Sequence, residues 1–296
     1  MKSFIILNKN ISIKKENKFI YFLVIIFSMN ITPTKAQTQN IETVSQTIHS
    51  EGLGRDLKLD IYVPKNSRSS SKLKTIYMND GQDGGQLELP KLLENYPHHD
   101  FILVAIHTNE NRLSDYGTSY IPDYKNRGDK ATLYMQFVKN ELTPFIRKNY
   151  PSSNRPEDNY FCGFSLGGLS AIDIVWENPG IFSKAGVFSG SFWWRSKAYE
   201  EGYDDDQDRI MHTKIRNSAH RDGLSFWFEC GTDDEKDDRN KNGIIDSIDD
   251  TLDLISELKK IGYQSRHIKY VEVKGGQHNF DTWKKVFPEF LDWALQ

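Results

Sequence analysis

The chain has 296 residues, of which 38 are Lys or Arg and 41 are Asp or Glu, so its formal net charge at pH 7 is −3. Residues 1–36 hold six of the Lys and one Glu, and the remaining 32 basic and 40 acidic residues give a balance of −8. This acidic balance argues against a nucleic acid or an anionic membrane as the partner.

The first 36 residues have the pattern of an export signal. Five Lys residues precede the apolar run 19–27, and Thr34 and Ala36 place small side chains where a signal peptidase reads. The apolar run is too short to span a bilayer comfortably; an uncleaved anchor is the alternative. We predict a signal peptide over residues 1–36, a secreted or periplasmic protein, and no membrane attachment after cleavage. Residues 37–296 are then one domain, long enough for a sizeable core.

Strand-like and helical patterns alternate along the rest of the chain. Strands are predicted near residues 56–64, 75–79, 101–107, 159–163, 184–189, 224–230 and 267–273. Helices are predicted near residues 131–149, 166–178, 250–262 and 281–295. This alternation is typical of an α/β protein with a mostly parallel, doubly wound sheet and helices on both faces.

A sharp turn with a serine is predicted between the strand at 159–163 and the helix at 166–178. Residues 163–167 read Gly-Phe-Ser-Leu-Gly, the Gly-x-Ser-x-Gly pattern of the nucleophile elbow in α/β-hydrolases. The turn holds the serine Oγ clear of the backbone, and the glycines leave room on either side. Ser165 is therefore the predicted nucleophile, and the α/β-hydrolase fold is the predicted fold class.

A serine hydroxyl needs a base that removes its proton, and in this fold the histidine follows the nucleophile in the chain. Four histidines follow Ser165. His212 and His220 stand in a polar stretch typical of the surface, and His267 starts a strand. His278 follows the last strand in a loop opened by two glycines, where a base can reach the elbow. We predict His278 as the general base.

A carboxylate should follow the strand between the elbow and His278, where it would accept the imidazole Nδ1–H. The strand at 224–230 is followed by Gly231-Thr-Asp-Asp234, so both Asp233 and Asp234 are available. Backbone N–H groups complete such a site as the oxyanion hole. The candidates are the N–H of Leu166, directly after the nucleophile, and the N–H of Gln82, after the strand at 75–79.

Seven short motifs occur in an order that is typical of one family, although each alone is weak. They are Tyr77-Met-Asn-Asp-Gly-Gln82, Arg112-Leu-Ser-Asp-Tyr116, Phe137 through Glu141-Leu-Thr-Pro-Phe-Ile146, Gly163-Phe-Ser-Leu-Gly-Gly168, Ser189-Gly-Ser-Phe-Trp-Trp194, Gly231-Thr-Asp-Asp234 and Gly276-Gln-His-Asn-Phe280. From about residue 55 to the end, the chain resembles the putative esterase family, which includes esterase D, enterobactin-type siderophore esterases, feruloyl and acetylxylan esterases, and mycolyltransferases.

The resemblance implies carboxylic-ester hydrolysis without a catalytic metal, and antiparallel first strands. The family's acid stands in a Gly-x-x-Asp turn, which implies Asp234. The chain departs from the family at two places. Asp80-Gly81 stands where many members have His-Gly, and the 44 residues from Asp234 to His278 include an insertion.

The insertion matches the template of a calcium-binding EF-hand loop, with Asp in place of the last Glu, as in dockerin-type loops. Counted from residue 238, oxygen side chains stand at positions 1, 3, 5, 9 and 12, a glycine stands at position 6, and position 7 offers a carbonyl. A charged surface loop is the alternative. The predicted ligands of this structural ion are Asp238, Asn240, Asn242, Ile244, Asp246 and Asp249.

Aromatic and charged residues near the predicted site are candidates for substrate binding. Trp193 and Trp194 follow the strand after the elbow, and Tyr116 stands in a long loop; each could stack on a sugar or an aryl acid, or fill the core. Arg112 could bind a carboxylate or catecholate, or pair with Asp115.

The two cysteines, Cys162 and Cys230, are predicted to be buried free thiols, because another strand should lie between them. Together these features predict an exported serine esterase that acts on acyl sugars (feruloyl or acetyl) or siderophore esters, with Ser165, Asp234 and His278 as its triad. An acyltransferase on the same scaffold and a non-catalytic binding module are the alternatives.

Overall fold

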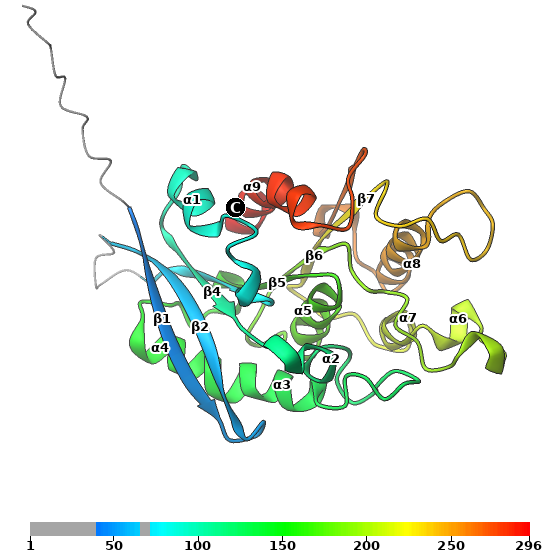
Figure 1. Cartoon of the computed structure of the whole chain (residues 1–296), viewed down its shortest axis with the longest axis horizontal. Coiled ribbons are helices and arrows are strands. Elements are labelled where there is room, and N and C mark those ends of the chain that lie inside the picture. The colour runs from blue at the N-terminus through cyan, green and yellow to red at the C-terminus, as the bar shows by residue number, and fades with distance from the viewer. Residues whose placement is uncertain (1–39, 66–71) are drawn as a thin grey trace, which may run out of the picture. The chain divides into compact units, whose positions relative to one another are not determined.

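The computed structural model describes residues 40–65 and 72–296, which build one sheet with helices on both faces (Figure 1). The signal peptide predicted at residues 1–36 lies outside the described residues. The strand order is β1-β2-β4-β3-β5-β6-β7-β8. The strands are β1 (Ile41–Ser50), β2 (Arg55–Pro64), β3 (Lys74–Met78), β4 (Phe101–Ile106), β5 (Asn159–Phe164), β6 (Lys184–Phe188), β7 (Ser225–Gly231) and β8 (Ile268–Val273).

The sheet is antiparallel at its beginning and parallel elsewhere. β1 pairs with β2 and β2 with β4 in antiparallel register, whereas all pairs from β4 through β8 are parallel. This arrangement confirms the predicted α/β fold and its antiparallel start. β1 was not predicted, because Ile41, Val44 and Ile48 do not alternate with polar residues in the period of two that marks a half-buried strand.

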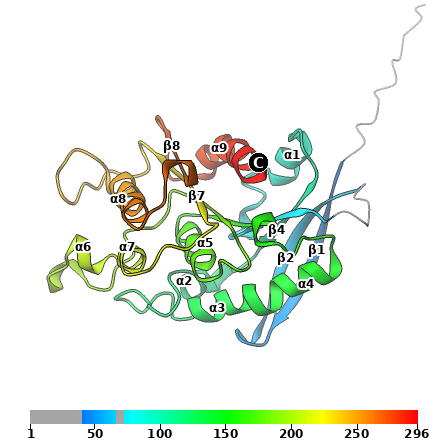
Figure 2. The ribbon, with the colours of Figure 1, turned by 180° about the vertical axis from the view of Figure 1, so that it is seen from behind.

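The helices form two layers that cover opposite faces of the sheet (Figure 2). One layer holds α1 (Leu89–Asn95) and α9 (Phe280–Leu295). The other includes α5 (Leu166–Glu177), α7 (Ile210–Arg216), α8 (Asp246–Lys260) and the helical stretch 131–149, in which a π-turn at Val138–Leu142 joins α3 (Ala131–Phe137) to α4 (Thr143–Asn149). The four helices predicted from periodicity are present, and α8 begins four residues earlier than expected. The unpredicted helices are short: α1, α2 (Arg112–Asp115), α6 (Asp205–Asp208) and α7.

Aromatic side chains fill the space between the sheet and α9. Phe188 of β6 packs on Phe287 and Phe290 of α9 with ring centroids 5.7 and 5.4 Å apart. Gly186 of β6 leaves room for this helix, since a Cβ there would lie 2.2 Å from the ring of Phe290. The position of α9 therefore depends on a close approach of helix and sheet at one glycine.

The two cysteines lie on β5 and β7, with β6 between them. Both Cys162 and Cys230 are buried free thiols, as predicted. Burial raises the pKa of both thiols, so neither is a thiolate at neutral pH.

No helix within residues 40–65 and 72–296 combines the length and the apolar character that crossing a bilayer requires.

We predict that Gly186→Ala destabilises the protein by about 1–3 kcal/mol, the usual cost of overpacking a core, because the ring of Phe290 must move. Gly180→Ala is the matched control: nothing lies within 4 Å of a Cβ there, and we expect a change within about 0.5 kcal/mol. Urea unfolding of both variants measures the difference. Equal stabilities would contradict the close helix–sheet contact.

Candidate active site

The turn between β5 and α5 holds Ser165 in a strained conformation. Its φ of 54° and ψ of −122° are rarely adopted by residues with a side chain. The turn is tight because a Cβ on Gly163 would lie 2.3 Å from the carbonyl oxygen of Gly167. The N–H of Ser165 donates to the carbonyl of Phe188 at 2.8 Å, which ties the turn to β6. Backbone contact thus requires Gly163, whereas a Cβ on Gly167 would lie 2.5 Å from the carboxylate of Asp80.

A cavity of about 350 Å³ brings the three predicted catalytic residues together. Ser165 reaches it from the elbow, Asp234 from the turn after β7, and His278 from the loop between β8 and α9. The other residues that line the cavity are Ser189, Gly190, Ser191, Trp193, Glu235 and Ser247. These serines and Glu235 were not predicted as site residues.

The two candidate acids differ in position. Asp234 lines the cavity, and both of its carboxylate oxygens are buried without a hydrogen-bond partner in the described part of the chain. Burial raises the pKa of Asp234, while the nearby Ser189 hydroxyl and the charge of His278 oppose that rise. Asp233 is exposed and does not line the cavity. The geometry therefore favours Asp234.

His278 stands at the exposed side of the cavity, next to the start of α9. Asn279 caps this helix by accepting the N–H of Thr282 at 3.0 Å, and the imidazole meets the ring of Trp283 edge-on, with centroids 5.2 Å apart. Partial desolvation lowers the pKa of His278, the positive charge of Arg112 lowers it further, and Asp234 raises it. The ring is therefore neutral at pH 7.

No hydrogen bond joins Ser165, Asp234 and His278 to one another among the described residues; the Ser165 Oγ lies 3.3 Å from the Oγ of Ser191. Catalytic hydrogen bonds are often long without substrate and shorten when it binds. The arrangement supplies a hydroxyl, a neutral base and a buried acid along one cavity.

The two predicted oxyanion donors lie near the elbow. Leu166 is the first residue of α5, so its N–H has no acceptor within the helix. Gln82 follows β3 in a short 3-10 turn. Its side chain donates to Asp80 and accepts the N–H of Thr108 at 3.2 Å, which fixes the turn. Neither residue lines the 350 Å³ cavity, and their role as donors stays a prediction.

Asp80, at the position of the family histidine, holds Arg112 in place. Arg112 donates to both carboxylate oxygens of Asp80, at 2.8 and 3.0 Å, and to the carbonyl of Phe164 at 3.2 Å. The pairing with Asp115 was wrong, because Asp115 is buried and pairs with Arg55 instead. About a third of the Arg112 side chain, 31%, stays exposed, and its charge acts on His278.

Two residues predicted to bind substrate lie in the core instead. Tyr116 is fully buried, and its hydroxyl accepts the N–H of Asp80 at 3.0 Å. Trp194 is also fully buried, whereas Trp193 lines the cavity. The guanidinium of Arg127 lies 5.1 and 5.0 Å from these two indole rings. Which of two adjacent aromatics faces the core depends on the backbone direction after β6, which the residue pattern does not reveal.

His212 is likewise buried rather than exposed. It lies on α7, its Nε2 is 2.8 Å from the carbonyl oxygen of Asp250, and burial lowers its pKa to about 3. A neutral, fully buried histidine on the helical face remote from the loop of His278 has a structural role.

Four of the six predicted calcium ligands converge in the loop after β7. The carboxylate of Asp238 accepts the N–H groups of Asn242 and Gly243 at 3.1 and 2.9 Å. The side-chain amides of Asn240 and Asn242 lie 2.7 and 2.8 Å from Asp249. This set of oxygen-bearing side chains suits a hard cation such as calcium.

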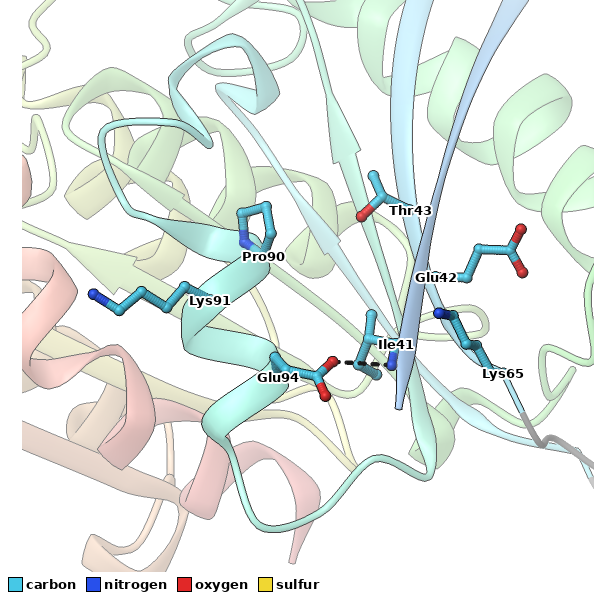
Figure 3. A pocket seen from close by; sticks show the side chains of 7 residues that line it. All are labelled: Ile41, Glu42, Thr43, Lys65, Pro90, Lys91 and Glu94. Carbon is cyan, nitrogen blue, oxygen red and sulfur yellow. Dashed lines mark hydrogen bonds between the residues drawn. The ribbon is translucent and has the colours of Figure 1, made fainter. Parts of the chain in front are cut away.

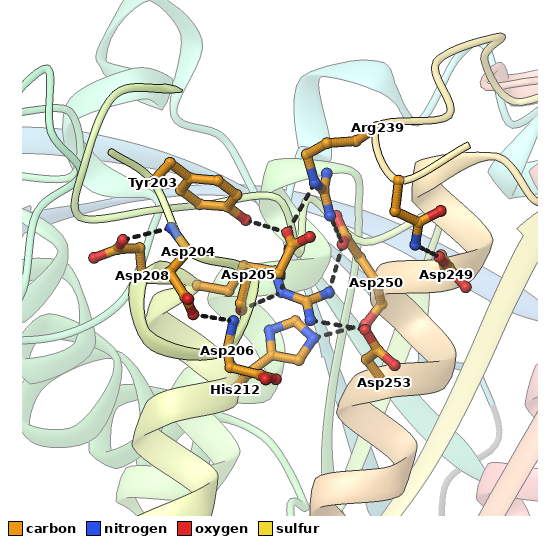
Figure 4. Close-up of polar contacts among 12 residues, drawn as sticks. Tyr203, Asp204, Asp205, Asp206, Asp208, His212, Arg239, Asp249, Asp250 and Asp253 are labelled. Carbon is orange, nitrogen blue, oxygen red and sulfur yellow. Dashed lines mark hydrogen bonds and ion pairs between the residues drawn. The ribbon is translucent and has the colours of Figure 1, made fainter. Parts of the chain in front are cut away.

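Asp246 departs from the calcium template. Its carboxylate pairs with Arg239 at 3.1 Å and accepts that residue's N–H, and Arg239 also reaches Asp205 and Asp250 (Figure 4). Ile244 is exposed. Across residues 40–65 and 72–296, no group of three or more His, Cys, Asp and Glu side chains forms a metal site. Calcium binding stays a prediction, with Asp246 the least suited ligand.

A larger cavity of about 700 Å³ lies between the start of β1 and α1 (Figure 3). There the carboxylate of Glu94 accepts the N–H groups of Asn40 and Ile41 at 2.9 and 3.2 Å. The residues that line this cavity are Ile41, Glu42, Thr43, Lys65, Pro90, Lys91 and Glu94. Because none of them is a histidine, serine or cysteine, the cavity offers no serine–histidine or cysteine–histidine pair for catalysis.

Comparison with known proteins decides the family. A model of the putative esterase family matches residues 50–294, which is most of the chain. The chain belongs to the putative esterase family. This confirms the resemblance seen in the sequence motifs, and the family makes the protein a carboxylic ester hydrolase.

Individual relatives of this esterase are distant. The uncharacterized protein YbbA of Bacillus subtilis is 23% identical over 252 residues, which cover 82% of this chain and 94% of that protein. The enterochelin esterase of Shigella flexneri superposes with a TM-score of 0.67 and 19% identity over 86% of this chain, but only 58% of its own length is matched. A ferulic acid esterase superposes with a TM-score of 0.64 and 14% identity, over 86% and 97% of the two chains. At such identities the likeness shows the shared fold.

We predict that Arg112→Gln raises the pKa of His278, because loss of a nearby positive charge favours the imidazolium. Glutamine keeps a donor for Asp80. Arg127→Gln is the control, since Arg127 pairs with Asp123 and does not shift the pKa of His278. NMR titration of the His278 ring measures both variants, and an unchanged or lower value in Arg112→Gln would contradict the prediction.

Proposed function

We propose that the esterase is exported and that Ser165, Asp234 and His278 form its catalytic triad. The observation that supports this most is the single cavity to which all three contribute from separate loops. Residues 1–36 are proposed to direct export to the periplasm or the medium, on the strength of their charged, apolar and small-residue pattern.

In the proposed reaction, the Ser165 Oγ attacks the ester carbonyl while His278 takes the hydroxyl proton. Asp234 accepts the imidazole N–H and stabilises the imidazolium. The N–H groups of Leu166 and Gln82 receive the oxyanion. His278 then gives the proton to the leaving alcohol, which leaves the acyl group on the Ser165 Oγ. In the second half of the reaction, His278 takes a proton from water as the water oxygen attacks the acyl carbon, and it returns that proton to the Ser165 Oγ as the acid leaves.

The protonation states suit these roles. The lowered pKa of His278 leaves a neutral base at pH 7, and the charge that forms on it favours the ionised form of Asp234. The carboxylate of Asp234 is therefore most stabilised when His278 is protonated, and His278 is protonated in the transition state of the proposed reaction.

The proposed substrates are acyl sugars with feruloyl or acetyl groups, or siderophore esters. Trp193 offers an aromatic wall in the cavity, and Arg112 offers a partly exposed cation near His278. An enterochelin esterase and a ferulic acid esterase share the fold. No cofactor is proposed for catalysis.

An acyltransferase on the same scaffold is the alternative, with a sugar hydroxyl in place of water. Product analysis with sugar acceptors separates the two, because transfer yields an acylated sugar and hydrolysis yields the free acid.

We predict that Asp234→Asn lowers kcat about 10³- to 10⁴-fold, because the imidazole loses the acceptor that fixes its tautomer. Asp233→Asn, one residue away and exposed, should stay within about threefold. Initial rates on p-nitrophenyl acetate measure both, and equal effects of the two Asp variants would contradict the assignment of the acid.

A phosphonate probe tests the nucleophile. It should label the wild type but not Ser165→Ala, and labelling of Ser165→Ala would contradict the assignment of Ser165.

We also propose that the loop 238–249 binds a structural calcium ion, held by Asp238, Asn240, Asn242 and Asp249. Saturating calcium should raise the melting temperature by several degrees relative to a chelator, because the ion binds only the folded loop. Asp238→Ala should abolish the shift, whereas Asp222→Ala, outside the loop and fully exposed, should keep it. Equal melting temperatures with calcium and chelator would contradict the site.

A further inference from the structure

Glu229 on β7 is a buried carboxyl group that the proposed reaction does not use. It is fully buried, and neither of its side-chain oxygens has a hydrogen-bond partner among the described residues. Its register partners are Phe188 on β6 and Val271 on β8, both of which pack in the apolar layer under α9. Burial raises the pKa of Glu229 to about 8, and the negative charge of Asp234 acts in the same direction. Glu229 is therefore neutral at pH 7.

Ser189 interacts with both Glu229 and the proposed triad acid, Asp234. The N–H of Ser189 donates to the carbonyl of Glu229 at 2.8 Å, and its Oγ accepts the indole N–H of Trp283 at 2.9 Å. The same hydroxyl acts on the pKa of Glu229 and on that of Asp234. One hydroxyl thus affects the pKa of two buried carboxyl groups.

The Ser189 hydroxyl has only one proton to donate to the two carboxyl groups, Glu229 and Asp234. A serine hydroxyl donates one hydrogen bond and accepts two, and Trp283 occupies one acceptor position. A protonated Glu229 can donate to the second position, which leaves the Ser189 proton for Asp234. If Glu229 were ionised, two carboxylates would compete for that one proton, and one of them would stay buried without a donor.

We propose that Glu229 is a positioning residue: as a neutral acid it donates to Ser189, whose hydroxyl then holds the carboxylate of Asp234 toward His278. The inference rests on the proposed triad and extends it by one residue. Glu229 itself touches no substrate, since it does not line the cavity.

The charged surroundings of Glu229 are few. Asp234, which is a carboxylate in the proposed triad, is the charged neighbour. Tyr270 on β8 and Cys230 on β7 interact with Glu229 and are neutral because their pKa values are raised. The neighbours from the segment directly after β6 and from α9 carry no charge: Ser189 and Trp283. Above pH 8, ionisation of Glu229 therefore places a second negative charge beside Asp234. The Ser189 hydroxyl can then donate to Glu229 instead of Asp234, so Asp234 loses that hydrogen bond.

Two substitutions separate positioning from a structural role. Glu229→Gln stays neutral at every pH and keeps an N–H donor for Ser189, so kcat at pH 7 should fall about two- to threefold and the loss of activity above pH 8 should disappear. Glu229→Leu suits the apolar layer but removes the donor. We expect kcat about tenfold lower at unchanged KM, with a melting temperature no lower than that of the wild type.

The experiment is a kcat profile from pH 6 to 10 on p-nitrophenyl acetate for the wild type and both variants, with Ser165→Ala as the blank. A wild-type decline above pH 8 that persists in Glu229→Gln would overturn the inference, as would wild-type kcat in Glu229→Leu. If Ser165→Ala still hydrolyses the ester, the proposed triad itself fails. If it is inactive while the Glu229 variants behave as wild type, only the role of Glu229 fails.

Discussion

The close contact between β5 and α5 at Ser165 is the constraint on which the site depends. A residue with φ of 54° and ψ of −122° costs about 1–3 kcal/mol of strain and persists only where surrounding contacts hold it. Those contacts are visible on both sides of the turn. Asn79 of the segment after β3 donates to the carbonyl of Gly167 at 2.8 Å, and Arg112 donates to the carbonyl of Phe164. The Asp80–Arg112 pair is therefore part of the support of the elbow. The carboxylate of Asp80 is buried, so loss of Arg112 would leave that charge without its partner, which makes the pair suited to fixing geometry.

The same principle applies on the far side of the cavity, where a network of buried charges joins α6, α7 and α8. Arg209 donates to Asp250 at 2.6 Å, and Arg239 reaches Asp250 at 2.7 Å and Asp205 at 2.8 Å (Figure 4). Arg239 belongs to the loop that follows Asp234, and the neighbouring Glu235 accepts the N–H of Ser247 in the cavity wall. The loop is thereby tied to two helices by charge–charge contacts, with or without an ion in its centre. Asp246 accordingly pairs with Arg239 rather than with the other predicted calcium ligands.

The sequence alone predicted the parts of the molecule that are carried by short-range pattern. Gly163-x-Ser165-x-Gly167, the Gly-x-x-Asp turn and the glycine loop before His278 each depend on local backbone geometry, and the parallel strands are apolar runs of ordinary length. What it could not predict is set by tertiary contacts. The partner of Arg112, the burial of Tyr116 and the choice between Trp193 and Trp194 depend on which segments lie opposite. Glu229 did leave a signal, as the one charged residue in the apolar run 224–230, but its meaning depends on Ser189, which is 40 residues away.

Backbone contact between two loops positions the proposed base, His278, and the proposed acid, Asp234. The N–H of Asp233 donates to the carbonyl of Gly276 at 2.8 Å, and a Cβ on Gly231 would lie 2.3 Å from that same carbonyl oxygen. The turn that bears Asp234 and the loop that bears His278 therefore cannot separate without breaking a backbone hydrogen bond. α9 adds the second restraint, because it begins directly after His278 and its Trp283 binds Ser189. The packing of α9 on the sheet consequently sets the positions of both the His278 imidazole and the Ser189 hydroxyl. A shift of α9 would move both groups together, so the geometry of the cavity depends on the core packing under this helix.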